Sequence, residues 1–317
     1  MTPFRGHFTP TISSAAAIST MAFETNKDVL DWFEKQDRTL TKQFIDSLPW
    51  SEIRKTPMDK KFLPVLLYMR DVEVLTEMYH RELQRTPTGR DPVISKFMER
   101  WGVEEVTHGQ VIDRFLNELG YPTPDDWQRR THQNVPRCYH FSTYFLTSLT
   151  NLLGSSFTAT HMTFGAIHEM STGQAYRRMK EIANHPVLSM ILEGIIREEA
   201  AHTHFYRSVA KIELERSESA QKIARKVIEI FWRPVGQGSL AKERTEYAIA
   251  TLFGDETGEG VGILDRTVTL RARQFPGFEG LTKTTERFRD ICRRLNPART
   301  AASFISILNA ASVIISA

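Results

Sequence analysis

Two copies of one short pattern combine residue types and a spacing that suit metal binding. They read Glu104-Glu105-Val106-Thr107-His108-Gly109 and Glu198-Glu199-Ala200-Ala201-His202-Thr203. Residues three apart share one face of a helix, so each copy can direct a carboxylate oxygen and an imidazole nitrogen at one point. Two such points make a dinuclear centre, and oxygen and nitrogen ligands of this kind suit iron or manganese.

A dinuclear centre in a helical bundle needs two further carboxylates, one from each of two other helices. Ahead of the first motif, Glu73 shares a stripe at helical spacing with Leu66, Met69 and Thr76. We therefore expect Glu73 to be a bridging or terminal ligand. Glu77 lies one turn later on nearly the same face and is the alternative.

The second carboxylate has a clearer candidate. Between Phe141 and Lys180 the chain carries one acid, Glu169, on a face with apolar and small residues. A carboxylate buried there without a partner would be costly. Metal coordination removes that cost, so Glu169 is the expected ligand from this helix.

Helices that position these residues are predicted along most of the chain. The sequence has 317 residues, 41% of them hydrophobic and 25% charged, and period-two alternation typical of strands is nearly absent. Amphipathic stretches recur at about 27–47, 59–85, 91–119, 138–183, 186–214, 217–232, 240–252 and 280–295. Pro- and Gly-containing breakers separate them, such as Thr86-Pro87-Thr88-Gly89, Gly120-Tyr121-Pro122 and His185-Pro186. The pattern predicts an all-α chain with a four-helix bundle core and flanking helices.

The predicted domain covers residues 26–296, with an extension before it and a tail after it. Residues 1–25 are expected to be disordered or transit-like, because residues 1–22 hold no acid and many Ser, Thr and Ala. Residues 297–317 form the tail, and the stretch from Ala301 to Ala317 carries no charge but is short for a membrane span. We expect a soluble protein, cytoplasmic in a bacterium or plastid-targeted if residues 1–22 are a transit peptide.

Composition limits the other classes of function. Two cysteines are too few for a disulfide framework or a thiolate cluster. A net charge of +3 does not indicate a nucleic-acid-binding protein. Residues 265–299 concentrate nine Arg or Lys against four acids, which fits a solvated helix face or, alternatively, a dock for an acidic partner.

Taken together, these motifs resemble those of the soluble acyl-acyl carrier protein desaturases, members of the ferritin-like di-iron superfamily. The resemblance covers about residues 60–232 and continues more weakly to about 295. The family's first motif has the form Glu-Glu-x-x-His-Gly, and its second has an acid, commonly Asp, where this chain has Glu198. Its first ligand precedes a Tyr, as Glu73 precedes Tyr79, and its remaining ligand is followed three positions later by an active-site Thr. The resemblance implies two irons on Glu73, Glu105, His108, Glu169, Glu199 and His202.

Three further residues have expected roles around such a centre. By resemblance, Thr172 lines the side where O2 binds. Glu104 and Glu198 each precede a ligand, and we expect each to accept a hydrogen bond from the imidazole of the opposite motif.

The resemblance also implies an activity and partners. It predicts a homodimer that uses O2 and electrons from a ferredoxin to place a cis double bond in a saturated chain on acyl carrier protein. A hydroxylase, an N-oxygenase or a non-enzymatic metal or oxygen sensor would keep the same ligands and is the alternative. The acyl chain would need an apolar channel, for which the candidate wall residues are Met98, Phe115, Phe141, Phe145, Leu149, Phe164 and Tyr176.

Overall fold

Helices form every regular element longer than a single bridge in the computed structural model, which describes residues 23–154 and 156–295. The all-α prediction is confirmed for these residues. The longer helices are α2 (Asn26–Glu34), α4 (Leu63–Val74), α5 (Thr76–Leu83), α6 (Pro92–Leu119), α8 (Arg137–Leu149), α9 (Ser156–Ala183), α10 (Pro186–Glu215), α11 (Glu218–Phe231), α12 (Lys242–Phe253) and α15 (Lys283–Arg294). Shorter ones are α3 (Lys42–Ser47), α7 (Trp127–Gln133), α13 (Glu259–Leu264) and α14 (Leu270–Ala272), and Asp265–Thr269 is a π-helical turn.

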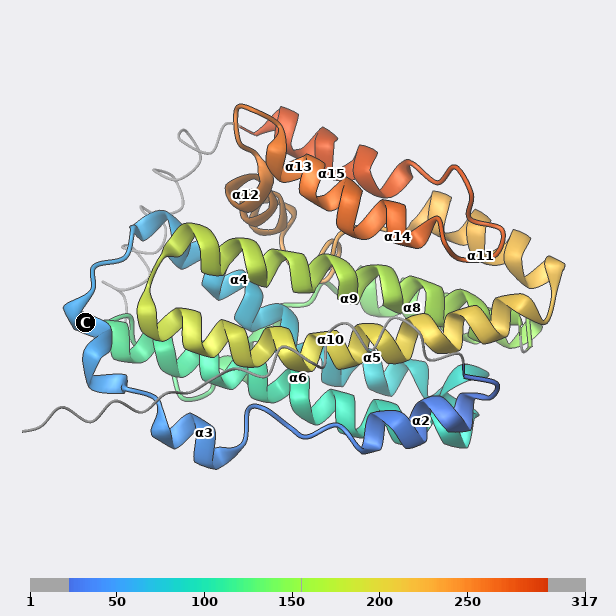
Figure 1. Ribbon diagram of the computed structural model, residues 1–317, viewed down its shortest axis with the longest axis horizontal. Coiled ribbons are helices and arrows are strands. Elements are labelled where there is room, and N and C mark those ends of the chain that lie inside the picture. Colours follow the sequence, from blue (N-terminus) through green and yellow to red (C-terminus); the bar gives the residue numbers. More distant parts are fainter. Residues whose placement is uncertain (1–22, 155, 296–317) are drawn as a thin grey trace, which may run out of the picture.

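Four helices make the central bundle (Figure 1). Helices α9 and α10 form a long antiparallel pair, α6 packs against α10, and α4 packs against α6. Helix α2 packs on the outer side of α6 and α10, while α11 and α12 lie against α9 and carry α13 to α15 as a further layer. One cluster of buried apolar side chains runs through all of these layers, from Val29 in α2 to Ile291 in α15.

The two motif helices begin and end where the sequence predicts. Helix α6 starts at Pro92, and the Asp91 side chain before it accepts hydrogen bonds from the backbone of Val93 and Ile94 at 2.9 and 3.1 Å. It ends at Gly120, which adopts a left-handed φ of 100°. Helix α10 likewise starts at a proline, Pro186, with His185 as its cap. A Pro at the first helical position loses no hydrogen bond, because that N–H has no partner inside the helix.

Three predicted stretches are divided in the structure. The stretch 27–47 contains α2 and α3, with a loop between them. The stretch 59–85 contains separate helices α4 and α5, because Leu75 between them has ψ of −10°, which ends the regular α-helix. The stretch 138–183 contains α8 and α9, joined by a turn through Gly154. No proline or glycine marks the break at Leu75, so the sequence pattern did not reveal it.

Gly109, the last residue of the first motif, lets α4 and α6 approach closely. A Cβ at this position would lie 2.8 Å from Val74 Cγ1 and 3.0 Å from the Arg70 carbonyl oxygen. A side chain there would push α4 away from α6, so the glycine brings Glu73 next to His108.

The predicted termini fall largely beyond the described residues. Residues 1–22 of the extension and the tail 297–317 lie outside them. Within the described part of the chain, no helix combines the length and the apolar character needed to cross a bilayer.

Candidate metal centre

Helices α6 and α10 bring the two motifs together in the middle of the bundle. His108 and His202 are 0% exposed, and Glu105 and Glu199 are 6% and 1% exposed. The two imidazole rings lie 6.0 Å apart between centroids. Each motif therefore presents its carboxylate and its imidazole to the same interior space.

The ligand atoms divide into two groups that share two residues. One group contains Glu73, Glu105, His108 and Glu199, and the other contains Glu105, Glu169, Glu199 and His202. Within each group the candidate ligand atoms lie within 4.8 Å of one another. Glu105 and Glu199 belong to both groups, as bridging carboxylates would, whereas Glu73 and Glu169 each belong to one.

Distances from the histidine Nδ1 atoms support this division. His108 Nδ1 lies 3.4 Å from a Glu199 oxygen and 3.7 Å from a Glu73 oxygen. His202 Nδ1 lies 3.0 Å from a Glu105 oxygen and 4.0 Å from a Glu169 oxygen. Both imidazoles thus turn the same nitrogen toward the carboxylates.

Glu73 and Glu77 are separated by the break at Leu75. Glu73 is 2% exposed and lies among the ligand atoms. Glu77 is on α5, where its side chain is 55% exposed and lies 3.5 Å from His132. The structure therefore places Glu73, and not Glu77, at the centre.

The residues fit a pair of cations. Buried polar atoms in proteins nearly always have a hydrogen-bond partner. Within residues 23–154 and 156–295, a set of buried atoms at the centre has none: Glu73 Oε2, Glu105 Oε1, both Glu199 carboxylate oxygens, His108 Nδ1 and His202 Nδ1. Two divalent cations would match the charge of the four carboxylates and provide these atoms with partners. The buried Glu and His groups can hold metal ions, and their geometry does not identify the metal.

The outward nitrogen of each imidazole contacts the glutamate that leads the opposite motif. His108 Nε2 lies 2.9 Å from Glu198, and His202 Nε2 lies 2.8 Å from Glu104. These contacts lie where the sequence analysis expected them. A carboxylate at this position accepts a hydrogen bond from the Nε2–H group, which leaves Nδ1 without a proton and free to bind a cation.

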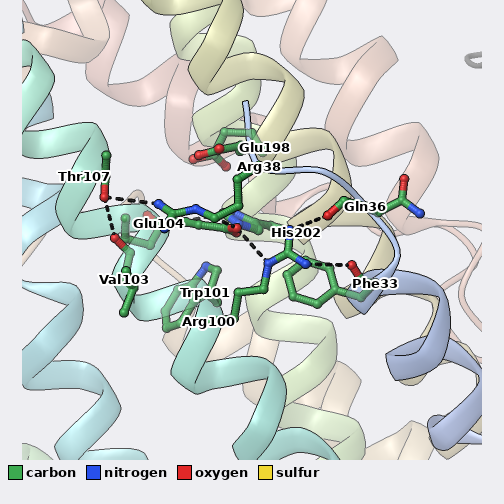
Figure 2. Close-up of polar contacts among 12 residues, drawn as sticks. Phe33, Gln36, Arg38, Arg100, Trp101, Val103, Glu104, Thr107, Glu198 and His202 are labelled. Atoms are coloured by element: carbon green, nitrogen blue, oxygen red, sulfur yellow. Dashed lines mark hydrogen bonds and ion pairs between the residues drawn. The ribbon is translucent and has the colours of Figure 1, made fainter. Parts of the chain in front are cut away.

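The two supporting glutamates are held by different partners. Arg100 donates to Glu104 at 2.8 Å, and Arg38 lies 3.4 Å from the same oxygen (Figure 2). Glu198 instead accepts hydrogen bonds from the backbone N–H groups of Thr39 and Leu40, at 2.7 and 2.8 Å. The sequence analysis missed both sets of partners, because they come from the loop after α2 and from an Arg one turn before Glu104.

Two aromatic residues hold the carboxylates that belong to only one group. The Tyr176 hydroxyl donates to Glu73, and the Trp101 indole N–H donates to Glu169 at 3.1 Å. The sequence analysis assigned no role to Trp101 and proposed Tyr176 only as a channel wall. A hydrophobic pattern ignores the Tyr176 hydroxyl and the Trp101 indole N–H, although these donors could have indicated a contact with a carboxylate.

Electrostatics differ between the two unshared carboxylates. Burial raises the pKa of Glu73, but its interactions with the nearby Glu105 carboxyl and His108 imidazole outweigh burial and lower the pKa overall. Burial and the nearby negative charge of Glu199 raise the pKa of Glu169 well above its usual value. Burial and the charges of Glu73 and Glu199 do the same to Glu105.

A narrow apolar cavity of about 40 Å³ lies beside the Glu73 group. Glu73, Ser171, Thr172 and Tyr176 line it together with apolar side chains of α4, α12 and α15. Thr172 therefore shares this cavity with Glu73, whereas Glu169 does not line it.

Most of the channel candidates do not line this cavity. Tyr176 does, whereas Met98 and Phe115 are 0% exposed in the general core and Phe141 is 77% exposed. Phe164 packs partly buried against the core. The side chains of Phe145 and Leu149 lie outside the described part of the structure. Helical periodicity identified buried residues without distinguishing the wall of a cavity from ordinary core.

The basic segment 265–299 is not one continuous free surface in its described part. Arg287 donates to backbone carbonyls at the end of α11, including that of Ile228 at 3.2 Å. Arg294 pairs with Glu246 at 2.7 Å, and Arg266 pairs with Glu259. Several of these charges thus hold the outer helices together.

Comparisons of the sequence with protein-family models and with curated proteins found no match.

Proposed function

We propose that this chain is a di-iron, O2-dependent oxidoreductase that introduces a cis double bond into a saturated acyl chain on acyl carrier protein. The observation that carries the metal part is the pair of ligand groups that share Glu105 and Glu199. Four carboxylates and two histidines on four helices are the ligand set of carboxylate-bridged di-iron proteins. The acyl substrate rests on the motif resemblance and on the apolar cavity.

Glu73, Glu105, His108, Glu169, Glu199 and His202 would hold the irons. Bound iron would activate O2, which is the oxidant that removal of two unactivated hydrogens requires. Glu104 and Glu198 keep the Nε2 protons in place and so orient both imidazoles. Burial of the whole set excludes water, which protects a strongly oxidising reaction from side reactions.

The apolar cavity is our proposed approach of the acyl chain to the centre. Its Thr172 hydroxyl lies on a wall shared with Glu73, and we assign it to the side where O2 reacts. The cavity is far smaller than a usual ligand pocket. An extended chain would enter by displacing flexible side chains, and Met69 on the cavity wall is the most adaptable of them.

The proposed partners are an acyl carrier protein, a ferredoxin-type donor and a second copy of the chain. Arg289 and Arg293, which form no ion pair within the described residues, leave part of the segment 265–299 available to an acidic protein.

The test is a single assay with purified, iron-loaded protein. Stearoyl and palmitoyl acyl carrier protein are incubated with ferredoxin, its reductase, NADPH and O2, and the products are analysed by mass spectrometry. Loss of two hydrogens from the acyl chain supports the proposal and identifies the chain length. Gain of one oxygen atom would indicate a hydroxylase, and an unchanged acyl chain despite O2 consumption would exclude both.

A further inference from the structure

A second and larger cavity, of about 230 Å³, reaches the metal centre along another face of α9. Helices α9 and α10 form two of its walls, and Thr267 of the π-helical turn and Arg271 of α14 form the third. Figure 1 shows α14 lying alongside α9, with which the π-helical turn is in contact. Glu169 and Glu199 of the metal centre also line this cavity.

Three arginines from these three elements surround the cavity: Arg177, Arg207 and Arg271. None of them forms an ion pair within residues 23–154 and 156–295, although the neighbouring Arg178 pairs with Glu181 at 2.9 Å. Burial and the positive charge of the nearby Arg271 lower the pKa of Arg207. Three guanidinium groups outnumber the two carboxylates, of Glu169 and Glu199, that line the same cavity. An excess of positive charge in a concave site favours an anionic ligand.

Two buried nitrogen atoms at this cavity have no hydrogen-bond partner in the part of the chain that the structure describes. They are Arg207 Nε and His204 Nε2. Among the residues that the structure describes, the only hydrogen-bond partner of Arg207 is Gln274, which accepts from Nη2 at 3.3 Å. The His204 ring is held in place against Trp32, with 4.2 Å between ring centroids. Buried polar atoms without partners are uncommon. Arg207 Nε always carries a proton, so an acceptor from a ligand is expected here.

Gly173 on α9 helps to form the cavity. An added Cβ would lie 3.2 Å from Arg177 Nη1 and 4.0 Å from the Cβ of Glu199. The missing side chain therefore lets Arg177 lie back along α9 toward the metal centre.

We infer that this arginine cavity binds an oxyanion, a phosphoryl or carboxylate group, next to the metal centre. Guanidinium groups present paired donors that match the oxygens of both groups. The inference rests on the proposed metal centre in one respect. Glu199 is the acid whose charge acts on Arg177, and a cation bound to Glu199 leaves all three arginines uncompensated.

Binding to the full-length chain tests this inference. Inorganic phosphate, acetate and octanoate are titrated calorimetrically at constant ionic strength against a chloride reference, and the metal content of every sample is measured. We expect oxyanion binding that weakens about tenfold in Arg207→Gln and again in Arg271→Gln, since each loses a charge-assisted hydrogen bond. Arg266→Gln is the matched control, because Arg266 lies in the same segment but pairs with Glu259, and it should bind as the wild type does.

The three probes distinguish the sources of the anion. Octanoate that binds more tightly than acetate shows that the anion is carried on an apolar chain, whereas equal affinities show a small free anion. Binding no stronger than that of chloride, or an unchanged affinity in the Arg207→Gln and Arg271→Gln double variant, overturns the inference. A chain that binds phosphate but holds no metal would refute the proposed function alone, while a desaturating, metal-loaded chain that binds no oxyanion would refute this inference alone.

Discussion

The two Glu-Glu-x-x-His motifs share the same three polar residues at the same spacing, but the protein supports them in different ways. Glu104 is held by the side-chain charges of Arg100 and Arg38, which are 25% and 35% exposed. Glu198 is held by two backbone N–H groups of the loop at Thr39 and Leu40. Both glutamates receive a hydrogen bond from the histidine of the other motif.

This difference separates a rigid support from an adjustable one. Backbone N–H groups in a packed loop cannot rotate away, so they fix which oxygen of Glu198 faces His108. Partly exposed arginines can move and exchange their contacts with water, and salt screens them. Both glutamates stay ionised for the same reason: burial raises the pKa of each, but the hydrogen bond with the opposite histidine outweighs burial and lowers it, to about 2 for Glu198.

The largest expected effect tests what the two motifs have in common. Glu105→Ala and Glu199→Ala each remove a shared ligand, so either variant should lose both ions and all turnover. Glu73→Ala and Glu169→Ala should lose mainly one ion, because each belongs to one group. Elemental analysis of purified variants measures this, with Glu77→Ala as the exposed control that keeps its metal. Unchanged stoichiometry in both shared-ligand variants would refute the ligand assignment.

The next effect compares the two supports directly. In Glu198→Gln the side-chain amide lies between donors on both sides. If its NH2 faces the loop, it opposes the backbone N–H groups of Thr39 and Leu40. If its NH2 faces His108, the imidazole proton must move to Nδ1, which then cannot bind a metal. We expect metal affinity to fall about 100-fold, at the upper end for such partners. Glu104→Gln should cost about 10-fold, because Arg100 and Arg38 can rearrange. Chelator competition measures both, and equal losses would mean that the two supports are equally rigid.

At falling pH, the two ligand groups should release their metal ions one after the other. A metal must displace the proton of Glu169, whose pKa is raised, whereas Glu73 has a lowered pKa and stays ionised. As the pH falls, the group with Glu169 and His202 should release its ion first, with affinity dropping about tenfold per pH unit for each proton taken up. Metal content measured across pH should fall in two steps. Glu169→Gln should abolish the more acid-sensitive step, and a single step in the wild type would contradict the assignment.

The smallest effect concerns the adjustable support alone. Arg100→Gln removes one guanidinium from Glu104 and leaves Arg38, so metal affinity should fall only about threefold, as expected for a partly exposed ion pair. The same arginine donates to the Gln36 carbonyl at 2.7 Å, so the free energy of unfolding should also fall by about 1 kcal/mol. Chemical unfolding measures this, and Lys96→Gln, an exposed change on the same helix, is the control.

Most of the helices and the ligand candidates could be predicted from local signals. Caps and breakers at Asp91, Gly120 and His185 mark real helix ends, and three-residue spacing places each Glu with its His on one face. The break at Leu75 could not be predicted, since no glycine or proline marks it and tertiary packing decides the direction of α5. For the same reason, the sequence left Glu77 as an alternative to Glu73.

The sequence by itself determined that two carboxylate and imidazole pairs face inward on two helices, because helical periodicity depends only on the order of nearby residues. Only the tertiary structure decided that Glu105 and Glu199 are shared and that loop N–H groups support one motif while arginines support the other. It also brought Arg177, Arg207 and Arg271 around one cavity. These features depend on the distance and register between helices, which arise from side-chain packing across segments far apart in the chain.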